Sequence, residues 1–326
     1  MELTAPLREI TRPAVSPERQ VRSSGMKMKD RRIRRETFGD TYPFAPNYRH
    51  VNGFDMHFVD EGKGEPVVLL HGDPTWGYLW RNIIPGLARI ARCVAPDHMG
   101  MGKSEVPREP YPYRLAHHIA NLEALMIGLD LHNITLVVHD WGGPVGLGFA
   151  IRHPDRIKRL VITNTWASAR WPGAPFPRLI EMIRSSGGEK FVLEKNGYLE
   201  RALIGTTRHF ERLSGPVMDA YRAPFPTPES RVAMLCWSRD IPVTEADPSS
   251  PEMQRIENGL TLFAKTPTLI VWGMLDPVLP DSVLRWWQGV YPQATIREIE
   301  DASHFLQEDA PQRIGDYISD FMAANP

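Results

Sequence analysis

Short apolar runs that alternate with helical segments constrain this chain more than any other feature. Continuous apolar stretches are typical of strands buried on both faces of a sheet. Strands that alternate with helices imply right-handed crossovers and a mostly parallel sheet. The sequence therefore predicts an α/β fold with a mostly parallel central sheet flanked by helices. The expected strands are residues 56–59, 67–70, 93–95, 134–138, 160–162, 268–272 and 295–299, and the expected helices are 116–129, 144–152 and 281–290.

The alternation stops between Trp166 and about Phe263. This stretch has helical patches and many prolines but no convincing buried strand, and it is too long for a loop in a compact domain. We interpret residues 166–263 as an inserted helical cap, and residues 41–165 and 264–326 as the core. The cap is expected over the carboxyl ends of the strands, where ligands bind in open α/β sheets.

Residues 1–40 lack sustained periodicity and are predicted to form a flexible arm. The chain has no apolar secretory signal, and its two cysteines are expected to be reduced thiols in the cytoplasm. A net charge of −1 gives no reason to expect nucleic acid as a partner, and no apolar run is long enough to span a membrane. No His/Cys cluster indicates a metal or a cofactor. The cysteines are Cys93 and Cys236, and the arm carries a basic stretch of Lys27, Lys29, Arg31, Arg32, Arg34 and Arg35.

The strand expected at 134–138 runs into residues 139–144, HDWGGP, and then into a helix. A sharp turn from strand to helix, with small residues where the backbones approach, is typical of a nucleophile elbow. Asp140 occupies the position that serine holds in the common version. Alone, it could equally be a helix N-cap. As a nucleophile it would already be ionised at neutral pH and could displace a leaving group from saturated carbon, which gives an alkyl ester.

Cleavage of such an ester requires water activated by a base, and His304 follows the last expected strand. Asp276, after the strand at 268–272, is the candidate acid that orients it. The order nucleophile, acid, histidine is that of the α/β-hydrolase fold. In that fold, the loop at residues 71–76, HGDPTW, supplies one oxyanion-hole N–H and Trp141 supplies the other. The Trp141 indole can also donate to an anion above Asp140.

Together these motifs resemble those of the haloalkane dehalogenases. The resemblance spans roughly residues 42 to 320 and is weakest in the cap. It rests on residues 42–44 (YPF), 71–76, 95–104 (APDHMGMGKS), 139–144, 164–166 (NTW), 272–276 (WGMLD) and 304–309 (HFLQED).

The resemblance implies a triad of Asp140, His304 and Asp276, with halide held by Trp141 and a second donor. It implies a small, neutral, apolar halogenated substrate, water as co-substrate, a halide product and no cofactor. The family often has asparagine where this chain has Asp73. Either the pKa of Asp73 is raised, so that it donates as a neutral acid, or Asp73 points away. In the second case a tryptophan of the cap would replace it, and the candidates are Trp171 and Trp166.

Three alternatives remain open on the sequence. A β-lactone decarboxylase shares the DWGG elbow and the GMG motif, and the resemblance extends to residues 240–242 (DIP) in the cap. An epoxide hydrolase would need cap tyrosines, for which Tyr198 and Tyr221 are available. A ligand-binding relative without turnover is disfavoured, because nucleophile, acid, base and oxyanion loop are all present.

Overall fold

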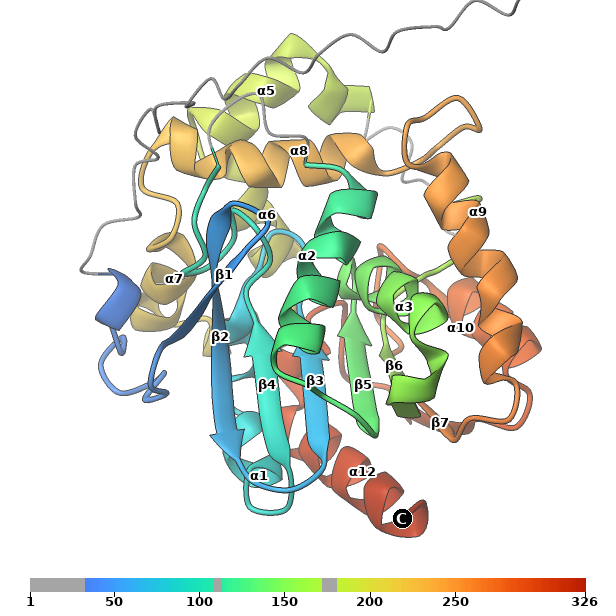
Figure 1. Ribbon diagram of the computed structural model, residues 1–326. Coiled ribbons are helices and arrows are strands. Elements are labelled where there is room, and N and C mark those ends of the chain that lie inside the picture. Colours follow the sequence, from blue (N-terminus) through green and yellow to red (C-terminus); the bar gives the residue numbers. More distant parts are fainter. Residues whose placement is uncertain (1–32, 108–112, 172–180) are drawn as a thin grey trace, which may run out of the picture.

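The computed structural model describes residues 33–107, 113–171 and 181–326. Its strands form one sheet in the order β1-β2-β4-β3-β5-β6-β7-β8 (Figure 1). The pairs β1–β2 and β2–β4 are antiparallel, and every other pair is parallel. The strands are β1 (Asn47–Val51), β2 (Phe54–Gly62), β3 (Pro66–Leu70), β4 (Arg92–Pro96), β5 (Ile134–His139), β6 (Ile157–Thr163), β7 (Thr268–Gly273) and β8 (Thr295–Ile299).

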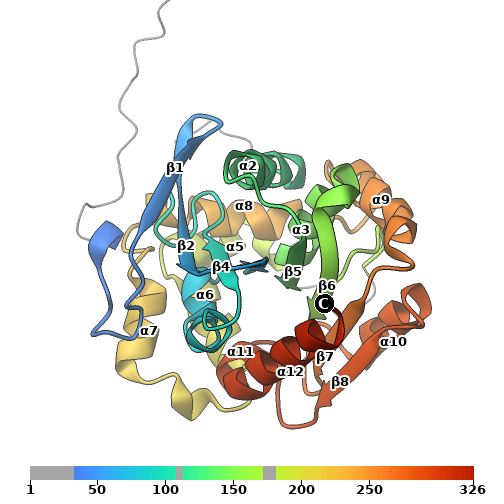
Figure 2. The same ribbon diagram turned by 60° about the horizontal axis from the view of Figure 1, so that its bottom comes forward.

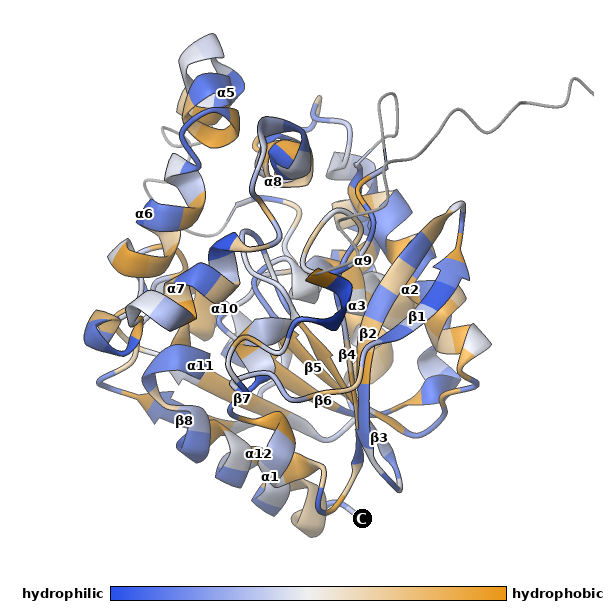
Figure 3. Cartoon of the chain, turned by 90° about the vertical axis from the view of Figure 1, so that its left-hand side faces the viewer, coloured by the Kyte–Doolittle hydropathy of each residue, from blue (hydrophilic) through white to orange (hydrophobic). Residues whose placement is uncertain are grey.

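The centre of the sheet is its most apolar part. Every residue of β3, β5 and β7 is buried, and Figure 3 shows these strands in hydrophobic colours. This explains why continuous apolar runs predicted them, and all seven expected strands are confirmed. The additional strand β1 pairs only with β2 at the edge of the sheet, and four of its five residues are at least partly exposed. Such a strand needs no apolar run, so the sequence carried no signal for it.

Helices cover both faces of the sheet (Figure 2). One layer contains the three helices that the sequence predicts at 116–129, 144–152 and 281–290, and these are confirmed. This layer consists of α2 (Leu115–Gly128), α3 (Gly142–Arg152), α9 (Ser250–Gly259) and α10 (Asp281–Val290), and the other contains α1 (Ile84–Leu87) and α12 (Pro311–Ala324).

The insertion places its helices over the carboxyl ends of the parallel strands (Figure 1). Helix α9 belongs to the flanking layer instead, although it falls within the stretch interpreted as cap. Arg152 on α3 pairs with Glu252 on α9 at 2.7 Å, and a Cβ on Gly259 would lie 2.7 Å from the Ile151 side chain. The cap helices are α5 (Ser186–Leu193), α6 (Gly197–Gly205), α7 (Gly215–Arg222) and α8 (Val232–Asp240).

Residues 33–40 pack on the core, although they fall within the stretch predicted as a flexible arm. Arg34 pairs with Asp55 at 3.0 Å and lies over the Tyr48 ring, and Phe38 contacts Trp76 edge-on. The basic residues 27–32 lie outside the described residues. Within the described part of the chain, no helix is long and apolar enough to cross a membrane.

Candidate active site

A tight turn between β5 and α3 holds Asp140. Its φ is 49°, in the left-handed region that costs energy for a residue with a side chain. Two glycines make the turn possible: a Cβ on Gly142 would lie 2.5 Å from the Leu70 carbonyl oxygen, and one on Gly143 would lie 1.8 Å from Thr165 Oγ1. The Thr165 hydroxyl donates to the Asp140 carbonyl at 2.5 Å. The fold thus lifts the Asp140 side chain above the end of the sheet.

Backbone N–H groups surround the Asp140 carboxylate. The N–H of Asp73 donates to Asp140 Oδ1 at 2.9 Å, and the backbone of Trp141 also hydrogen bonds to the carboxylate. Gly72 must lack a side chain, because a Cβ there would lie 2.1 Å from Asp140 Oδ1. Burial raises the pKa of Asp140, but His304, His139 and the backbone donors outweigh it, so the pKa is lowered. Asp140 is therefore ionised at neutral pH.

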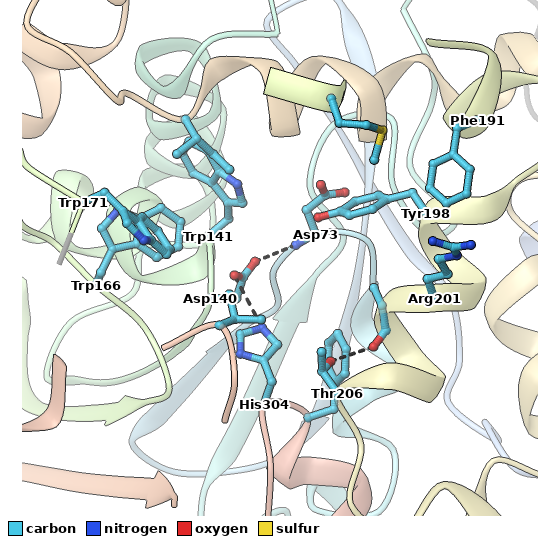
Figure 4. A pocket seen from close by; sticks show the side chains of 15 residues that line it. Asp73, Asp140, Trp141, Trp166, Trp171, Phe191, Tyr198, Arg201, Thr206 and His304 are labelled. Carbon is cyan, nitrogen blue, oxygen red and sulfur yellow. Dashed lines mark hydrogen bonds and ion pairs between the residues drawn. The ribbon is translucent and has the colours of Figure 1, made fainter. Parts of the chain in front are cut away.

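His304 joins Asp140 to Asp276. Its Nδ1 lies 2.8 Å from Asp276 Oδ2. Its Nε2 lies 3.6 Å from Asp140 Oδ2 (Figure 4). The Asp276 carboxylate also accepts from the N–H groups of Val278 and Leu279, at 2.7 and 3.0 Å. The structure thus brings together the three side chains that the sequence proposes as nucleophile, base and acid.

Asn164, at the end of β6, is a supporting residue that the sequence did not identify. Its side-chain amide donates to Asp276 Oδ2 at 2.8 Å, and its side-chain oxygen accepts from the Gly273 N–H at 2.8 Å. Asn164 therefore fixes the carboxylate that orients His304. The available signals were its place in the 164–166 motif and its position after a buried strand, next to the strand that leads to Asp276.

The protonation of His304 depends on its two carboxylate neighbours. Burial lowers the pKa of His304, but Asp276 and Asp140 outweigh it and raise the pKa to about 10. The free site thus holds an imidazolium between two carboxylates. If Asp140 became a neutral ester, one of these charges would vanish and the imidazole would release its proton more readily.

Asp73 is the second carboxyl group beside Asp140, and it points into the pocket (Figure 4). The Ser238 hydroxyl of α8 donates to Asp73 Oδ2 at 3.0 Å. Among the described residues, Asp73 Oδ1 is buried without a hydrogen-bond partner. Burial and the charge of Asp140 raise the pKa of Asp73 well above its usual range, although Ser238 and Tyr198 favour the ionised form. The raised pKa favours the protonated form of Asp73, which has a proton to donate. No pattern in the sequence pointed to Ser238.

A pocket of about 180 Å³ opens above Asp140 and His304. Trp141, Trp166 and Trp171 form one aromatic wall, with ring centroids of successive pairs 5.2 and 5.1 Å apart. Asp73 and the α6 residues lie across from them (Figure 4). The remaining described wall is mostly apolar, with Met182, Phe191, Tyr198, Arg201, Ala202, Thr206, Ile241, Val278 and Phe305.

Metal ligands are not gathered at this site. The described residues contain no group of three or more histidine, cysteine or acidic side chains that could hold a metal ion. Asp140, His304 and Asp276 contact one another instead, in the order expected of a nucleophile, a base and the acid that orients it.

Comparison with known proteins places this geometry among the α/β-hydrolases. A model of the family described as alpha/beta hydrolase fold matches residues 65–311. A cis-3-alkyl-4-alkyloxetan-2-one decarboxylase from Shewanella oneidensis is 38% identical over 284 residues, which cover 86% of this chain and 89% of that protein. A haloalkane dehalogenase from Sphingobium indicum is 36% identical over 291 residues, which cover 86% of this chain and 96% of that protein.

Solved structures agree with this placement. The haloalkane dehalogenase DatA from Agrobacterium tumefaciens superimposes with a TM-score of 0.79 at 30% identity, covering 86% of this chain and 97% of that one. A putative ancestral haloalkane dehalogenase superimposes with a TM-score of 0.77 at 30% identity, covering 85% and 99%.

Proposed function

Because this chain belongs to the α/β-hydrolase family and, within it, to the haloalkane dehalogenase family, we propose that it hydrolyses haloalkanes to an alcohol and a halide. The observation that carries this proposal is an ionised carboxylate, Asp140, at the nucleophile elbow, 3.6 Å from a histidine that Asp276 orients. A carboxylate attacks saturated carbon without prior deprotonation. The mostly apolar pocket above it suits a small halogenated alkyl substrate.

In the first step, a carboxylate oxygen of Asp140 attacks the carbon that carries the halogen. A carbon–oxygen bond forms, and the carbon–halogen bond breaks with its electron pair leaving on the halide. The product of this step is an alkyl ester on Asp140. Its halide is held by the Trp141 indole N–H and by the protonated carboxyl of Asp73, both of which donate to an anion. A neutral Asp73 adds no repulsive charge.

In the second step, water cleaves the ester at the Asp140 carbonyl carbon. With Asp140 esterified, the negative charge that raised the pKa of His304 is gone, so the imidazolium releases its proton to solvent. The neutral imidazole then takes a proton from the attacking water, and the hydroxide adds to the ester carbonyl carbon. When the tetrahedral intermediate collapses, the carbon–oxygen bond to the alkoxide breaks and the alkoxide takes the hydroxyl proton of the intermediate. The N–H groups of Asp73 and Trp141 stabilise the oxyanion that develops. The alcohol then leaves, Asp140 is restored as a carboxylate, and Asp276 stabilises the imidazolium throughout.

The test is incubation of the purified protein with 1-bromobutane and 1,2-dibromoethane. Bromide and alcohol should appear in equal amounts, and Asp140→Asn should abolish both. In a single turnover in ¹⁸O-labelled water, the label should enter Asp140 rather than the alcohol, because water attacks the ester carbonyl. Absence of bromide with every one of a dozen haloalkanes would overturn the proposal.

Decarboxylation of a β-lactone is a second candidate, favoured by the 38% identity to the oxetanone decarboxylase. Asp140 would attack the ring carbon bonded to oxygen in an oxetan-2-one, which opens the ring to an alkyl ester with a β-carboxylate that accepts a hydrogen bond from Asp73. The bond from the β-carboxylate to its neighbouring carbon would then break to release carbon dioxide, and its electron pair would form the alkene as Asp140 leaves as a carboxylate. Incubation with a cis-3,4-dialkyloxetan-2-one decides the matter: an alkene and carbon dioxide support this candidate, and recovery of intact lactone removes it.

Epoxide hydrolysis is less well supported by the positions of the cap tyrosines. Tyr198 lines the pocket, but the hydroxyl of Tyr221 donates to Glu308 and Tyr221 is not part of the pocket wall. A ligand-binding role without turnover is disfavoured by the assembled Asp140, His304 and Asp276. Styrene oxide offered in place of bromoalkane should remain unhydrolysed.

A further inference from the structure

One face of helix α6 forms part of the pocket wall and carries a cation. Residues Tyr198, Arg201 and Ala202, with Thr206 just after the helix, recur at helical spacing and all line the pocket. In Figure 4, Arg201 lies on the side of the pocket opposite Trp166 and Trp171. Its guanidinium lies over the Phe191 ring, 5.3 Å from the ring centre. A charged group thus borders a mostly apolar cavity.

Arg201 lacks a carboxylate partner among the described residues. Its neighbour Glu200 is occupied by Arg222, through contacts of 2.5 and 2.8 Å. The Arg201 side chain is exposed, so it keeps its charge without a desolvation cost. Arg222, by contrast, pairs with Glu200 and Asp219. Arg201 instead keeps its donors available at the edge of the pocket.

A second hollow of about 490 Å³ adjoins the pocket on this side. The two hollows share Met182, Phe191 and Arg201 in their walls. The outer hollow adds the exposed side chains of Lys190, Lys195 and Glu194. Within the described part of the chain, neither lysine forms a salt bridge. Three cations and one anion therefore surround the outer end of the cavity.

We propose that the substrate is an alkyl chain with its reacting carbon at one end and a carboxylate at the other, and that Arg201 binds the carboxylate. The proposal rests on the function proposed above and adds the substrate class. The orientation follows from charge: the ionised Asp140 at the inner end repels an anion, whereas Arg201 attracts it. An arginine fork also matches the two oxygens of a carboxylate. Lys190 and Lys195 strengthen the field but make no direct contact in this scheme.

Binding of unreactive chains tests the substrate class independently of turnover. Octanoate and 1-octanol would be titrated by tryptophan fluorescence, because Trp166 and Trp171 line the pocket. The quantity compared is the ratio of the Kd for octanol to the Kd for octanoate. This ratio should be about tenfold larger in wild type than in Arg201→Gln, which corresponds to about 1.4 kcal/mol. Sodium sulfate at about 300 mM should reduce the preference. Sulfate replaces chloride here because halide is a product of the proposed reaction.

Lys265→Gln is the matched control. Lys265 is an exposed cation without a salt bridge in the described structure, three residues before β7 and thus at the end of the sheet remote from the pocket. Its loss changes the net charge as much as the loss of Arg201 but should leave the octanoate preference unchanged. Arg201→Lys, which keeps the charge without the fork, should retain part of the preference.

Turnover supplies the second readout. Bromide release from 6-bromohexanoate and 1-bromohexane should show a higher kcat/KM for the carboxylate in wild type, and Arg201→Gln should lose this advantage mainly through KM. An equal octanoate-to-octanol preference in wild type and Arg201→Gln would overturn the substrate class, even if bromoalkanes are hydrolysed. An Arg201-dependent preference without any bromide release would support it and overturn dehalogenation alone.

Discussion

Two carboxyl groups at the same pocket behave in opposite ways because their neighbours differ. Asp140 lies beside His304 and accepts backbone hydrogen bonds, so its pKa is lowered. Asp73 lies beside Asp140, and burial without a cation raises its pKa. In the proposed mechanism one group is the nucleophile and the other a hydrogen-bond donor, a division of roles set by environment rather than residue type.

Substitution of Asp73 by asparagine tests this division. The amide side chain would keep a donor for the halide without a titratable proton. We expect Asp73→Asn to keep or raise kcat on bromoalkanes at neutral pH. Wild-type activity should fall at alkaline pH as Asp73 ionises and repels the halide, whereas the variant should lose less. The measurement is a pH profile of bromide release for both proteins, and a large loss in the variant at neutral pH would contradict the assignment.

Sequence signals were sufficient for some site residues and absent for others. Asp140 and Asp276 follow the buried strands β5 and β7, and His304 follows the mostly exposed strand β8. Parallel strands bring their carboxyl ends to one edge of the sheet. The partner of Asn164 lies 112 residues further along the chain, so only the folded sheet reveals their contact. Ser238 and Arg201 are in the cap, where no strand order fixes which side chains face the pocket.

At the scale of elements, the central strands and flanking helices were easier to predict than the edge strand, the position of α9 and the segment before β1. Apolar runs marked the buried strands, and glycines marked the elbow. The edge strand β1 and the contact of α9 with α3 lacked such signals, because one is half exposed and the other follows from tertiary packing. Residues 33–40 also lacked a sequence signal, because tertiary contacts such as that of Phe38 with Trp76 hold them on the core.

A buried ion pair ties the segment after β3 to the segment that carries His304, and a cap tyrosine hydrogen bonds to it. Arg81 donates to both oxygens of Glu308, at 2.5 and 2.8 Å, in the short helix α11 (Leu306–Asp309). Tyr221 of cap helix α7 donates to the same carboxylate. Both members of the ion pair are nearly inaccessible, with side chains 5% and 2% exposed. Removal of one partner would leave a buried charge uncompensated.

We therefore expect Glu308→Gln to lower the free energy of unfolding by about 3–5 kcal/mol. Urea titration at neutral pH measures the change. Glu298→Gln is the matched control, because Glu298 is exposed on β8 and makes no salt bridge in the described structure; it should change stability by less than about 0.5 kcal/mol. Equal stability of the two variants would show that the Arg81–Glu308 pair contributes little.

At the scale of the whole molecule, buried titratable groups make stability depend on pH. The pKa of His304 is raised to about 10 in the folded protein, against about 6.5 when unfolded. Protonated His304 therefore adds to the free energy of unfolding. This stabilisation is complete below about pH 6.5 and is lost as pH rises toward 10. The pKa values of His71, His98, His118 and His139 are lowered by burial. Their unfolded forms take up protons below about pH 6.5, so acid also destabilises the fold.

A variant tests whether His304 causes the loss of stability at alkaline pH. Asp140→Asn removes a charge that raises the pKa of His304, so its stability should fall less than that of wild type between about pH 6.5 and 9. Urea unfolding midpoints at several pH values give the two slopes. Both proteins carry Asp73→Asn in this comparison, because Asp140 also raises the pKa of Asp73. Contributions from groups that do not depend on Asp140, such as Lys103, then cancel in the difference. A slope as steep in Asp140→Asn as in wild type would contradict the coupling of His304 to Asp140.

The most direct test of the account is whether Asp140 becomes an ester. His304→Gln should still be alkylated but should not hydrolyse the ester, because no base activates water. After incubation with 1-bromobutane, mass spectrometry should find one butyl group on the peptide that contains Asp140, with about one bromide released per protein. The double variant with Asp140→Asn should carry none. Absence of the butyl adduct in His304→Gln, while wild type releases bromide, would contradict the covalent mechanism.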